Sequence, residues 1–529
     1  MAWMVREVGW VEGADPRVDV ARRMGVPTAG VRAVTLVKKS LDARQRTKRW
    51  WAVYRVTLED GVRPREPLAK GVREWTGRDE GRYGLADGAP ERRAWPSDLR
   101  PVVVGAGPAG LFAALYLAEA GAPVTLIERG GPVESRIPAV NGFWRGQRDL
   151  DPENNLVFGE GGAGTFSDGK IYTRRRDGEL GFIFRRLVDF GADPSVFTDA
   201  LAHLGTDKIR ALLPPFRARL EELGVEIRYH TAVASLLVEG GRCVGVQLAD
   251  GETLRRAPVI VATGHSARDA TQMMVEAGAE ARARGIAVGV RVEHPQALID
   301  RSRYRRPDRG TLPPASYRLT HHVEGGVRGR TFCMCPGGMV VPASNHPDRV
   351  VVNGMSFAAR RAYWANSAVI VEIEPDVYGA PDPLAGFRWQ DAIESACFQA
   401  TGSYAAPAQR VVDFLAQRGS TELPRTSFPM GVVAGSLHDV LPDVVTRGLT
   451  ETMQAFERQL PGFVSADAVM IAPETRTTSP VQFARTAGGE STTLPGLFPA
   501  GEGAGYAGGI VSSALDGLRA ARHLCATVA

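Results

Sequence analysis

The chain has 529 residues, of which 44% are hydrophobic and 23% are charged, as in an ordinary globular protein. Its longest apolar stretch, residues 102–127, is broken by four glycines and an acidic residue, which excludes a membrane-spanning helix there. The formal net charge of +5 is uneven, because residues 1–100 hold 21 basic and 14 acidic residues and six of the nine tryptophans. This asymmetry predicts a separate N-terminal module. The first residues lack the layout of a signal peptide, so we expect a cytoplasmic protein.

The N-terminal module reads as a small α/β unit. Asp15 can cap a helix that has Pro16 at its first position, and residues 31–37 and 50–58 read as strands. The basic connection 38–49 is either an ordinary surface loop or a face for a polyanion. We favour the loop and expect no nucleic-acid partner, because no RNA-binding signature is present. Residues 61–100 read as a linker or irregular arm.

The rest of the chain alternates helical and strand patterns. Residues 174–223 contain two helical patterns, the second interrupted by Pro214 and Pro215. Short strands with Gly-Gly and Asp-Gly turns follow, and residues 286–375 predict a largely antiparallel sheet. Further predicted elements are helices at 389–398 and 449–460, a strand at 496–501 and a final helix at 509–525.

A glycine motif at residues 105–110 carries the functional argument. The sequence Gly-Ala-Gly-Pro-Ala-Gly follows an apolar strand and precedes a helix without breakers, the context of a dinucleotide-binding turn. Gly105 permits the tight turn, Gly107 lets the backbone approach a pyrophosphate, and Gly110 lets the helix pack on the strand. Glu128 ends the next strand, 18 positions after Gly110, where a carboxylate accepts hydrogen bonds from ribose hydroxyls. This acid disfavours a 2′-phosphate, so a NADP-like nucleotide is not expected.

A second glycine-rich segment, residues 154–170, predicts a loop whose amides wrap a phosphate or line a cofactor. A plain flexible loop is the alternative interpretation. The five cysteines form no disulfide framework, and the spacing of Cys333 and Cys335 is not by itself a zinc-ligand spacing, so we expect no metal site. These two residues are either buried structural thiols or redox groups.

Three later segments resemble parts of two-dinucleotide-binding flavoproteins. Residues 259–264 (VIVATG) resemble the strand that re-enters the nucleotide domain. Residues 497–503 (LFPAGEG) resemble the late strand whose acid holds the ribityl chain of FAD, with Glu502 in place of the usual Asp. Gly508-Gly509-Ile510 opens the last helix, whose N-terminus would face the flavin and stabilise negative charge on it.

The chain as a whole resembles the bacterial FAD-dependent dehydrogenase family of the glutathione-reductase-like superfamily. The segments that carry this resemblance are KKSLDAR, VVVGAGPAGLFAALYLAEAG, FGEGGAGTFSDGKIYT, GVRVEHPQ, TFCMCPGG, VNGMSFAAR and FPAGEGAGYAGGIVSSALDG. The resemblance implies bound FAD, a β-rich substrate domain, and redox chemistry on a small organic substrate.

The predicted fold is α/β, with a Rossmann-type FAD-binding domain, a mainly antiparallel β substrate domain and a small α/β N-terminal module. The expected boundaries are 1–98 for the module and linker, 99–180, 225–270 and 475–529 for the FAD-binding domain, 181–224 for a helical insertion, and 271–474 for the substrate domain.

The cofactor-binding prediction covers both ends of the chain. It comprises Gly105, Gly107, Pro108, Ala109, Gly110, Glu128, Arg129, Arg136, Gly161, Gly162, Gly164, Thr165, Ser167, Val233, Ala262, Thr263, Gly264, Gly501, Glu502, Gly509 and Ile510.

The flavin would carry the difficult chemistry, while the protein positions the substrate and supplies protons. Lys170, His321 and Cys335 are the predicted catalytic residues. Tyr317 and Arg476 are the predicted substrate residues, and Arg476 either pairs a substrate carboxylate or forms a structural salt bridge.

Only one complete glycine-motif-then-acid unit is present, and there is no C-x-x-C or C-x-x-x-x-C pair in the FAD half. Disulfide reduction is therefore not expected, and electrons must come from or go to a molecule that visits the flavin, for which NAD(P)H is one candidate. The alternatives are an FAD-dependent monooxygenase, a flavin-dependent RNA-modifying protein that uses the basic N-terminal module, and a non-catalytic flavoprotein.

Overall fold

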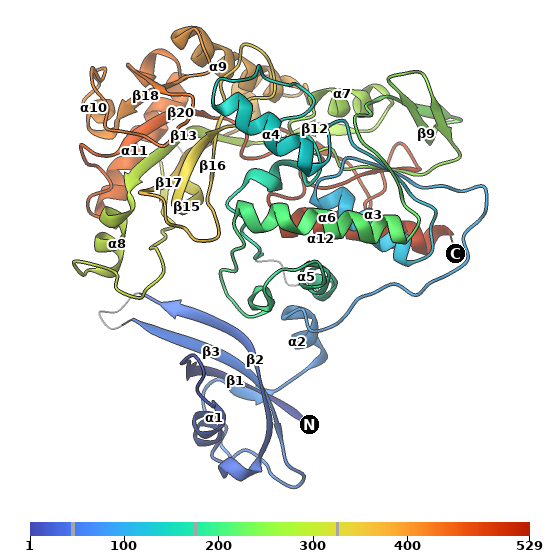
Figure 1. The fold of residues 1–529 in the computed structure, drawn as a ribbon, viewed down its shortest axis with the longest axis vertical. Helices are drawn as coiled ribbons and strands as arrows, with labels where there is room; N and C mark the ends of the chain where they lie inside the picture. The colour runs from blue at the N-terminus through green and yellow to red at the C-terminus, as the bar shows by residue number, and fades with distance from the viewer. Residues whose placement is uncertain (44–47, 174–176, 324–326, 529) are drawn as a thin grey trace. The chain divides into compact units, whose positions relative to one another are not determined.

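The computed structural model describes residues 1–43, 48–173, 177–323 and 327–528, drawn in Figure 1. The chain divides into two units. The first combines residues 1–89 with 170–203, and the second combines 90–169 with 204–529. The first unit thus includes residues 170–203, which the sequence analysis divided between the FAD-binding domain and a helical insertion. The domain boundaries given there stay a prediction.

The first unit contains an antiparallel sheet in the order β2-β3-β1-β4. Alternate residues of β3 point into a small core that includes Trp3, Val5, Val20, Tyr54 and Val56, as period-2 patterning requires. Its helices and strands are β1 (Ala2–Gly9), α1 (Arg17–Met24), β2 (Val31–Asp42), β3 (Arg49–Leu58), β4 (Val72–Glu74), α2 (Gly77–Arg82) and α5 (Leu180–Asp189).

Two sequence interpretations of this unit need correction. The strand predicted at 31–37 is confirmed but extends to Asp42, so the loop interpretation was wrong for residues 38–42, which pair with β3 as far as Asp42 opposite Arg49; backbone pairing tolerates the basic residues on this strand. The stretch 61–100 is more than a linker, since β4 and α2 lie within it; a three-residue strand is too short to show a pattern. Residues 44–47 of the basic connection lie outside the described residues.

The second unit contains a parallel five-stranded sheet in the order β22-β11-β5-β6-β7. Helices α3 and α12 pack side by side (Figure 1), and Gly517 permits this because a Cβ there would lie 2.0 Å from the Ala109 carbonyl oxygen. The elements are β5 (Val102–Val104), α3 (Pro108–Glu119), β6 (Thr125–Ile127), β7 (Glu226–Arg228), β11 (Val259–Val261), β22 (Leu497–Pro499) and α12 (Ile510–Val528).

The expectation that prolines interrupt a helix before residue 223 was wrong, because α6 (Thr206–Glu222) runs through Pro214 and Pro215. An interior proline costs a helix about 3 kcal/mol. One face of α6 is nevertheless buried, and Phe216 packs edge-on against Phe112 of α3 with ring centroids 5.2 Å apart. Burial of this face offsets the lost backbone hydrogen bonds.

Further elements of the second unit surround the parallel sheet. They are α4 (Val133–Trp144), and the small antiparallel sheet of β8 (Val233–Glu239), β9 (Arg242–Leu248) and β10 (Thr253–Arg255).

The predicted antiparallel sheet is confirmed as an eight-stranded sheet in which β13, buried along almost its whole length, lies between β17 and β20. Among the described strands of this sheet, β18 and β19 form the one parallel pair. The strands are β13 (Ile286–Pro295), β14 (Thr320–His322), β15 (Arg328–Pro342), β16 (Val352–Met355), β17 (Trp364–Ile373), β18 (Ala406–Arg410), β19 (Val432–Ala434) and β20 (Val469–Glu474).

Five helices and a two-stranded ribbon complete this part of the chain. They are α7 (Arg268–Glu276), α8 (Gln296–Tyr304), α9 (Ala385–Thr401), α10 (Val411–Leu415), α11 (Asp443–Gln459), β12 (Ala281–Ala283) and β21 (Val481–Phe483). Within the described ranges, no helix combines the length and apolar character that a membrane crossing requires.

Candidate functional site

The glycine turn between β5 and α3 has two kinds of glycine. Gly105 (φ +102°) and Gly110 are required by protein packing, because a Cβ would lie 2.6 Å from the Ala262 oxygen at the first and 1.8 Å from the Gly105 oxygen at the second. Gly107 is different, since its φ is −77° and a Cβ there would meet only the Cα of Gly162, at 3.9 Å. Neither strain nor packing explains Gly107, whereas the close approach of a ligand does.

Glu128 organises the turn from the end of β6. Its buried carboxylate accepts hydrogen bonds from the backbone amides of Ala106 (2.8 Å), Gly130 (2.9 Å) and Gly159 (2.9 Å). A carboxylate has about four acceptor positions, so one remains for a ribose hydroxyl. Glu128 therefore holds three loops together at the place where it would also hold a nucleotide.

The second glycine loop lies against the first. The Gly161 amide donates to the Ala106 carbonyl (2.8 Å), and a Cβ on Gly162 (φ +58°) would lie 3.1 Å from the Cα of Gly107. The short helix η2 (Gly162–Phe166) follows. Thr165 donates to the Glu160 carbonyl (2.9 Å), and Ser167 donates to the Gly164 carbonyl (2.8 Å).

Arg136 supports this loop from within. Its guanidinium is fully buried and donates to the carbonyls of Asn155, Leu156 and residues 159–160 and to the Thr165 hydroxyl. Burial lowers its pKa to about 9. With its donors directed at the protein itself, Arg136 fixes the loop, and contact with a cofactor stays a prediction.

Segments from the far end of the chain complete the arrangement. A Cβ on Gly164 would lie 3.3 Å from Cγ1 of Ile510, the first residue of α12, and 3.7 Å from Cγ of Pro108. The Gly501 amide donates a hydrogen bond to the buried carboxylate of Asp516 (2.8 Å). Arg485 donates two further hydrogen bonds to the same carboxylate. The structure thus brings together the segments 105–110, 159–167, 262–264 and 501–510.

A histidine that the sequence analysis missed stands beside Glu502. His265 Nδ1 lies 3.5 Å from Glu502 Oε1, while the second ring nitrogen, Nε2, is buried without a hydrogen-bond partner. A Cβ on Gly503 would lie 2.7 Å from the Gly264 oxygen, so the two motifs touch through their backbones. His265 follows the Ala-Thr-Gly segment directly, and that adjacency is the signal that could have found it.

The meeting point of these segments fits FAD. Apart from the neighbouring residues in the chain, no atom of the described residues lies within 4 Å of a Cβ built on Gly264 or Gly508, and only Ser512 Oγ, at 3.9 Å, approaches one on Gly509. The N-termini of α3 and α12 both begin at such open glycines, and helix N-termini present N–H groups and positive dipole ends to anions. Exposed backbone at this point suits a dinucleotide.

Two other predicted cofactor residues lie at the border of this region. Arg129 pairs with Glu153 (3.4 Å) and Asp269, and its guanidinium lies 4.7 Å from the Phe158 ring centroid. Val233 begins β8 and packs on the core beneath β5 and β11. Their contact with a cofactor stays a prediction.

The predicted catalytic residues lie in different elements. Lys170 belongs to the first unit, where its backbone bridges to His203, and His321 lies on the edge strand β14. Cys335 is fully buried in β15, and its thiol donates to the Cys333 carbonyl (3.2 Å). Tyr317, a predicted substrate residue, is buried edge-on against Phe463, and burial raises its pKa. Their roles stay predictions.

A buried ion pair lies at the centre of the eight-stranded sheet. Arg291 of β13 pairs with Glu474 of β20 (2.7 and 3.1 Å) and donates to Asn353, Asn366 and the Cys333 carbonyl. It thereby joins three segments that carry the family resemblance, GVRVEHPQ, TFCMCPGG and VNGMSFAAR. Within the described ranges, no group of His, Cys, Asp and Glu side chains could hold a metal ion.

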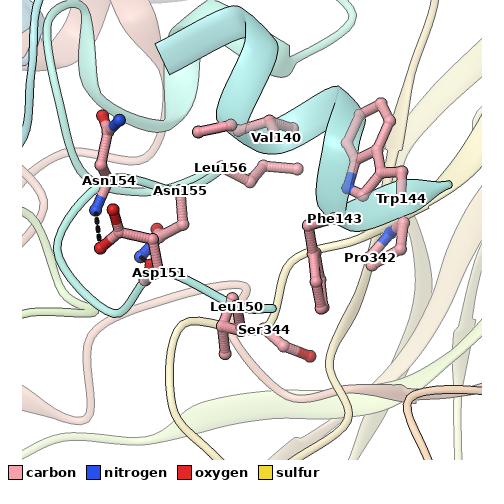
Figure 2. A pocket seen from close by; sticks show the side chains of 11 residues that line it. Val140, Phe143, Trp144, Leu150, Asp151, Asn154, Asn155, Leu156, Pro342 and Ser344 are labelled. Atoms are coloured by element: carbon pink, nitrogen blue, oxygen red, sulfur yellow. Dashed lines mark hydrogen bonds between the residues drawn. The ribbon is translucent and has the colours of Figure 1, made fainter. Parts of the chain in front are cut away.

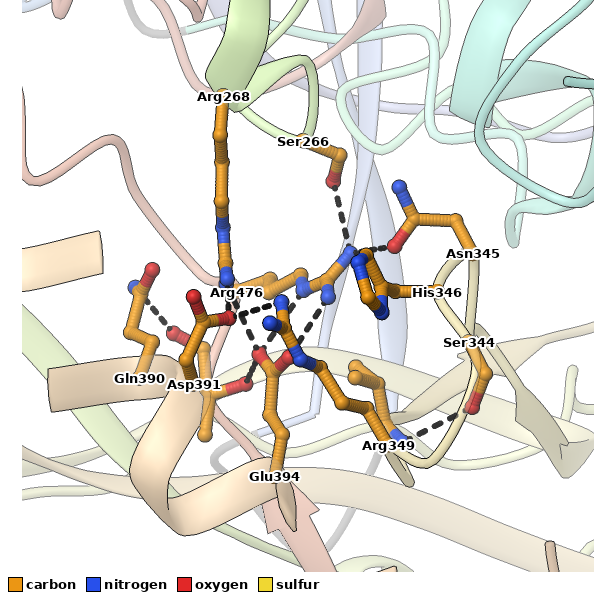
Figure 3. A network of polar contacts seen from close by, with 12 residues as sticks. Ser266, Arg268, Ser344, Asn345, His346, Arg349, Gln390, Asp391, Glu394 and Arg476 are labelled. Atoms are coloured by element: carbon orange, nitrogen blue, oxygen red, sulfur yellow. Dashed lines mark hydrogen bonds and ion pairs between the residues drawn. The ribbon is translucent and has the colours of Figure 1, made fainter. Parts of the chain in front are cut away.

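Arg476 lies in a polar network with Glu394, Arg268, Arg349 and Asp391 (Figure 3). Near it, a small hollow lies between α4, the loop 150–156 and the segment 342–344 (Figure 2). Its lining is mainly apolar: Ala139, Val140, Phe143, Trp144, Leu150, Asp151, Asn154, Asn155, Leu156, Pro342 and Ser344.

Three family models match the chain. Residues 285–477 match "FAD-dependent protein, C-terminal domain-like", residues 202–363 match "FAD dependent oxidoreductase", and residues 100–143 match "FAD binding domain". An uncharacterized protein of Clostridium beijerinckii is 40% identical over 430 residues, which cover 80% of each chain.

Among solved structures, the chain is similar to a geranylgeranyl bacteriochlorophyll reductase-like protein from Thermoplasma acidophilum (13% identity, TM-score 0.35, 81% of this chain and 79% of that chain). It is also similar to the flavin-dependent brominase Bmp2 (13% identity, TM-score 0.36, 82% and 79%). From the family models and the Clostridium relative together, the chain belongs to the FAD-dependent oxidoreductase family.

Proposed function

We propose that the protein is an FAD-dependent dehydrogenase or reductase that exchanges a hydride between flavin N5 and a small organic substrate. The observation that carries this proposal is the meeting of four glycine-rich segments around open backbone at Gly107, Gly264 and Gly508. Bound FAD would supply the hydride-transfer chemistry, as cofactors do.

The chain's own residues would bind and orient the cofactor. Gly107 and the first turn of α3 would receive the pyrophosphate. Glu128 would accept from a ribose hydroxyl while it holds its three backbone amides. Glu502, kept in place beside His265, would meet the ribityl chain. The α12 N-terminus at Ile510 would stabilise negative charge on the flavin.

A visiting molecule would exchange electrons with the flavin. Among the described residues, the five cysteines form no disulfide bond and four of them are buried, which gives no support to a dithiol relay. NAD(P)H is the first candidate for a transient donor, and a small-molecule substrate is the proposed partner.

The visible spectrum of the purified protein tests the proposal. We expect a yellow protein that releases FAD on denaturation, and anaerobic bleaching of the flavin by NADH, NADPH or an oxidisable substrate. A protein that neither contains nor takes up FAD would refute it. A reduced flavin that consumes O₂ through a peroxyflavin would instead identify a monooxygenase.

A further inference from the structure

Five charged side chains from four segments converge in the second unit (Figure 3). Arg268 begins α7, Arg349 lies in the connection between β15 and β16, and Arg476 follows β20 by two residues. Asp391 and Glu394 lie three residues apart on α9, so they share one face of that helix. We call these five residues the arginine cluster.

Glu394 is the buried centre of the cluster. Nε and Nη2 of Arg476 donate hydrogen bonds to its two carboxylate oxygens (2.9 and 2.7 Å), and the Thr475 hydroxyl donates a third (2.7 Å). Although burial opposes ionisation, the positive charges of Arg476 and Arg268 lower the pKa of Glu394 to about 2. The charges of Arg476 and Glu394 therefore neutralise each other, and Arg476 serves to hold the Glu394 side chain in position.

The remaining charges do not balance. Arg268 and Arg349 both pair with Asp391, and Arg268 also reaches Glu394 at 3.4 Å. Three guanidinium groups against two carboxylates leave one positive charge uncompensated. Burial, together with the nearby guanidinium of Arg476, lowers the pKa of Arg268 to about 9 and also lowers the pKa of Arg349. Partly buried, uncompensated charge is costly unless an anion joins it.

The two arginines with the uncompensated charge are the accessible ones. Arg268 and Arg349 keep 18% and 20% of their side-chain surface exposed, against 7% for Arg476 and none for Glu394. Neutral polar groups border the same place: Asn345 and the Ser266 hydroxyl accept hydrogen bonds from Arg476. The planar fork of arginine matches the geometry of carboxylate and phosphate groups.

The position of the cluster links it to the cofactor site and to an apolar surface. Ser266 follows the predicted FAD-binding residue Gly264 by two positions. Ser344, one residue before Asn345, lines the apolar hollow of Figure 2 together with Pro342. An anion held at Arg268 and Arg349 would thus have both cofactor-binding backbone and apolar side chains nearby.

We propose that the arginine cluster is a binding site for the carboxylate of a small organic acid with an apolar body, with Arg268 and Arg349 as its ligands. The inference rests on the proposed function only in taking this acid to be the substrate. Carboxylate binding requires no turnover, so absence of binding would not refute the proposed FAD-dependent activity, and absence of that activity would not refute binding.

Calorimetric titration of the FAD-loaded protein with benzoate tests the site, with benzyl alcohol as a neutral analogue and inorganic phosphate as a second anion. We expect saturable benzoate binding, no binding of benzyl alcohol, and a dissociation constant raised about tenfold or more in Arg349→Gln, the loss of one charge-assisted contact. Arg268→Gln provides a second variant if the first fails to fold.

Arg388→Gln is the matched control. Arg388 lies on the same helix as Asp391 and Glu394, but it is exposed and pairs with Asp382, so benzoate binding should not change. Absence of benzoate binding, or binding unaffected by both cluster variants, would overturn the proposal. Binding of phosphate but not benzoate would overturn the assignment to an organic carboxylate.

Discussion

Substitution of Glu128 by Gln would test how the cofactor turn is held. The carboxylate accepts three backbone amides, two on one oxygen and one on the other. A Gln side chain keeps one acceptor oxygen but turns its NH₂ group toward a backbone amide, so at least one of the three hydrogen bonds is lost. The remaining hydrogen bonds are weaker because their acceptor no longer carries a charge. Hydrogen bonds to a charged group contribute about 1.5–3 kcal/mol and neutral ones about 1 kcal/mol, so exchanging three of the first kind for two of the second gives a loss of about 2.5–7 kcal/mol.

The expected change in melting temperature follows from the size of the second unit. An unfolding entropy of about 2.1 cal/mol/K per residue over roughly 400 residues is about 0.85 kcal/mol/K. A loss of about 2.5–7 kcal/mol therefore lowers the apparent Tm of the apoprotein by roughly 3–8 °C. The dissociation constant for FAD should also rise by about tenfold, because a ribose hydroxyl loses a charged acceptor.

Differential scanning calorimetry and FAD titration of the apoprotein provide the two measurements. The control is Glu226→Gln on the neighbouring strand β7, where a half-buried carboxylate at the surface pairs with Arg100 and Arg228 and should contribute about 1 kcal/mol or less. If Glu128→Gln melted within about 1 °C of the wild type and bound FAD equally well, the reasoning about this carboxylate would be refuted.

Three further substitutions test other parts of the second unit. Glu293 of β13 accepts hydrogen bonds from the backbone amide and the hydroxyl of Ser427, and burial raises its pKa to about 7, above the unfolded value near 4.5. Its contribution to stability is therefore full below pH 4.5 and is lost as pH rises to 7. The Tm of Glu293→Gln relative to the wild type should increase between pH 5 and pH 8, and a constant difference would contradict this. Glu474→Leu leaves Arg291 buried without its partner and should cost about 3–5 kcal/mol by calorimetry, whereas an unchanged Tm would show that the pair is dispensable. A Cβ at residue 107 has room in the protein, so Gly107→Ala should leave the apoprotein Tm unchanged while it lowers FAD retention, and a variant as yellow as the wild type would place the cofactor elsewhere.

Local sequence patterns predicted the elements that make the cofactor site. The turn at residues 105–110 is readable because the strand, glycines and helix that create it are adjacent in the chain, and each glycine has a local steric reason. The strands at 50–58 and 286–295 were readable for the same reason, since alternation or a continuous apolar run is a local property. The resemblance to FAD-dependent proteins rested on such short segments.

Tertiary contacts decided what local patterns could not. Pro214 and Pro215 predict a break, yet packing of the α6 face on α3 sustains the helix. His265 and Glu502 are 237 positions apart in the chain. The parallel pairing of β11 with β22 and the close approach of Gly264 and Gly503 make them neighbours.

The sequence by itself predicted a strand–turn–helix unit of the dinucleotide-binding type and an antiparallel sheet that follows it, because backbone conformation and burial follow from neighbouring residues. The tertiary structure alone decided which charges meet. Arg476 could have faced a ligand or a carboxylate, and the fold gave it Glu394 while leaving Arg268 and Arg349 with excess charge. Charge balance depends on distances between segments remote in sequence, and no local pattern encodes those distances.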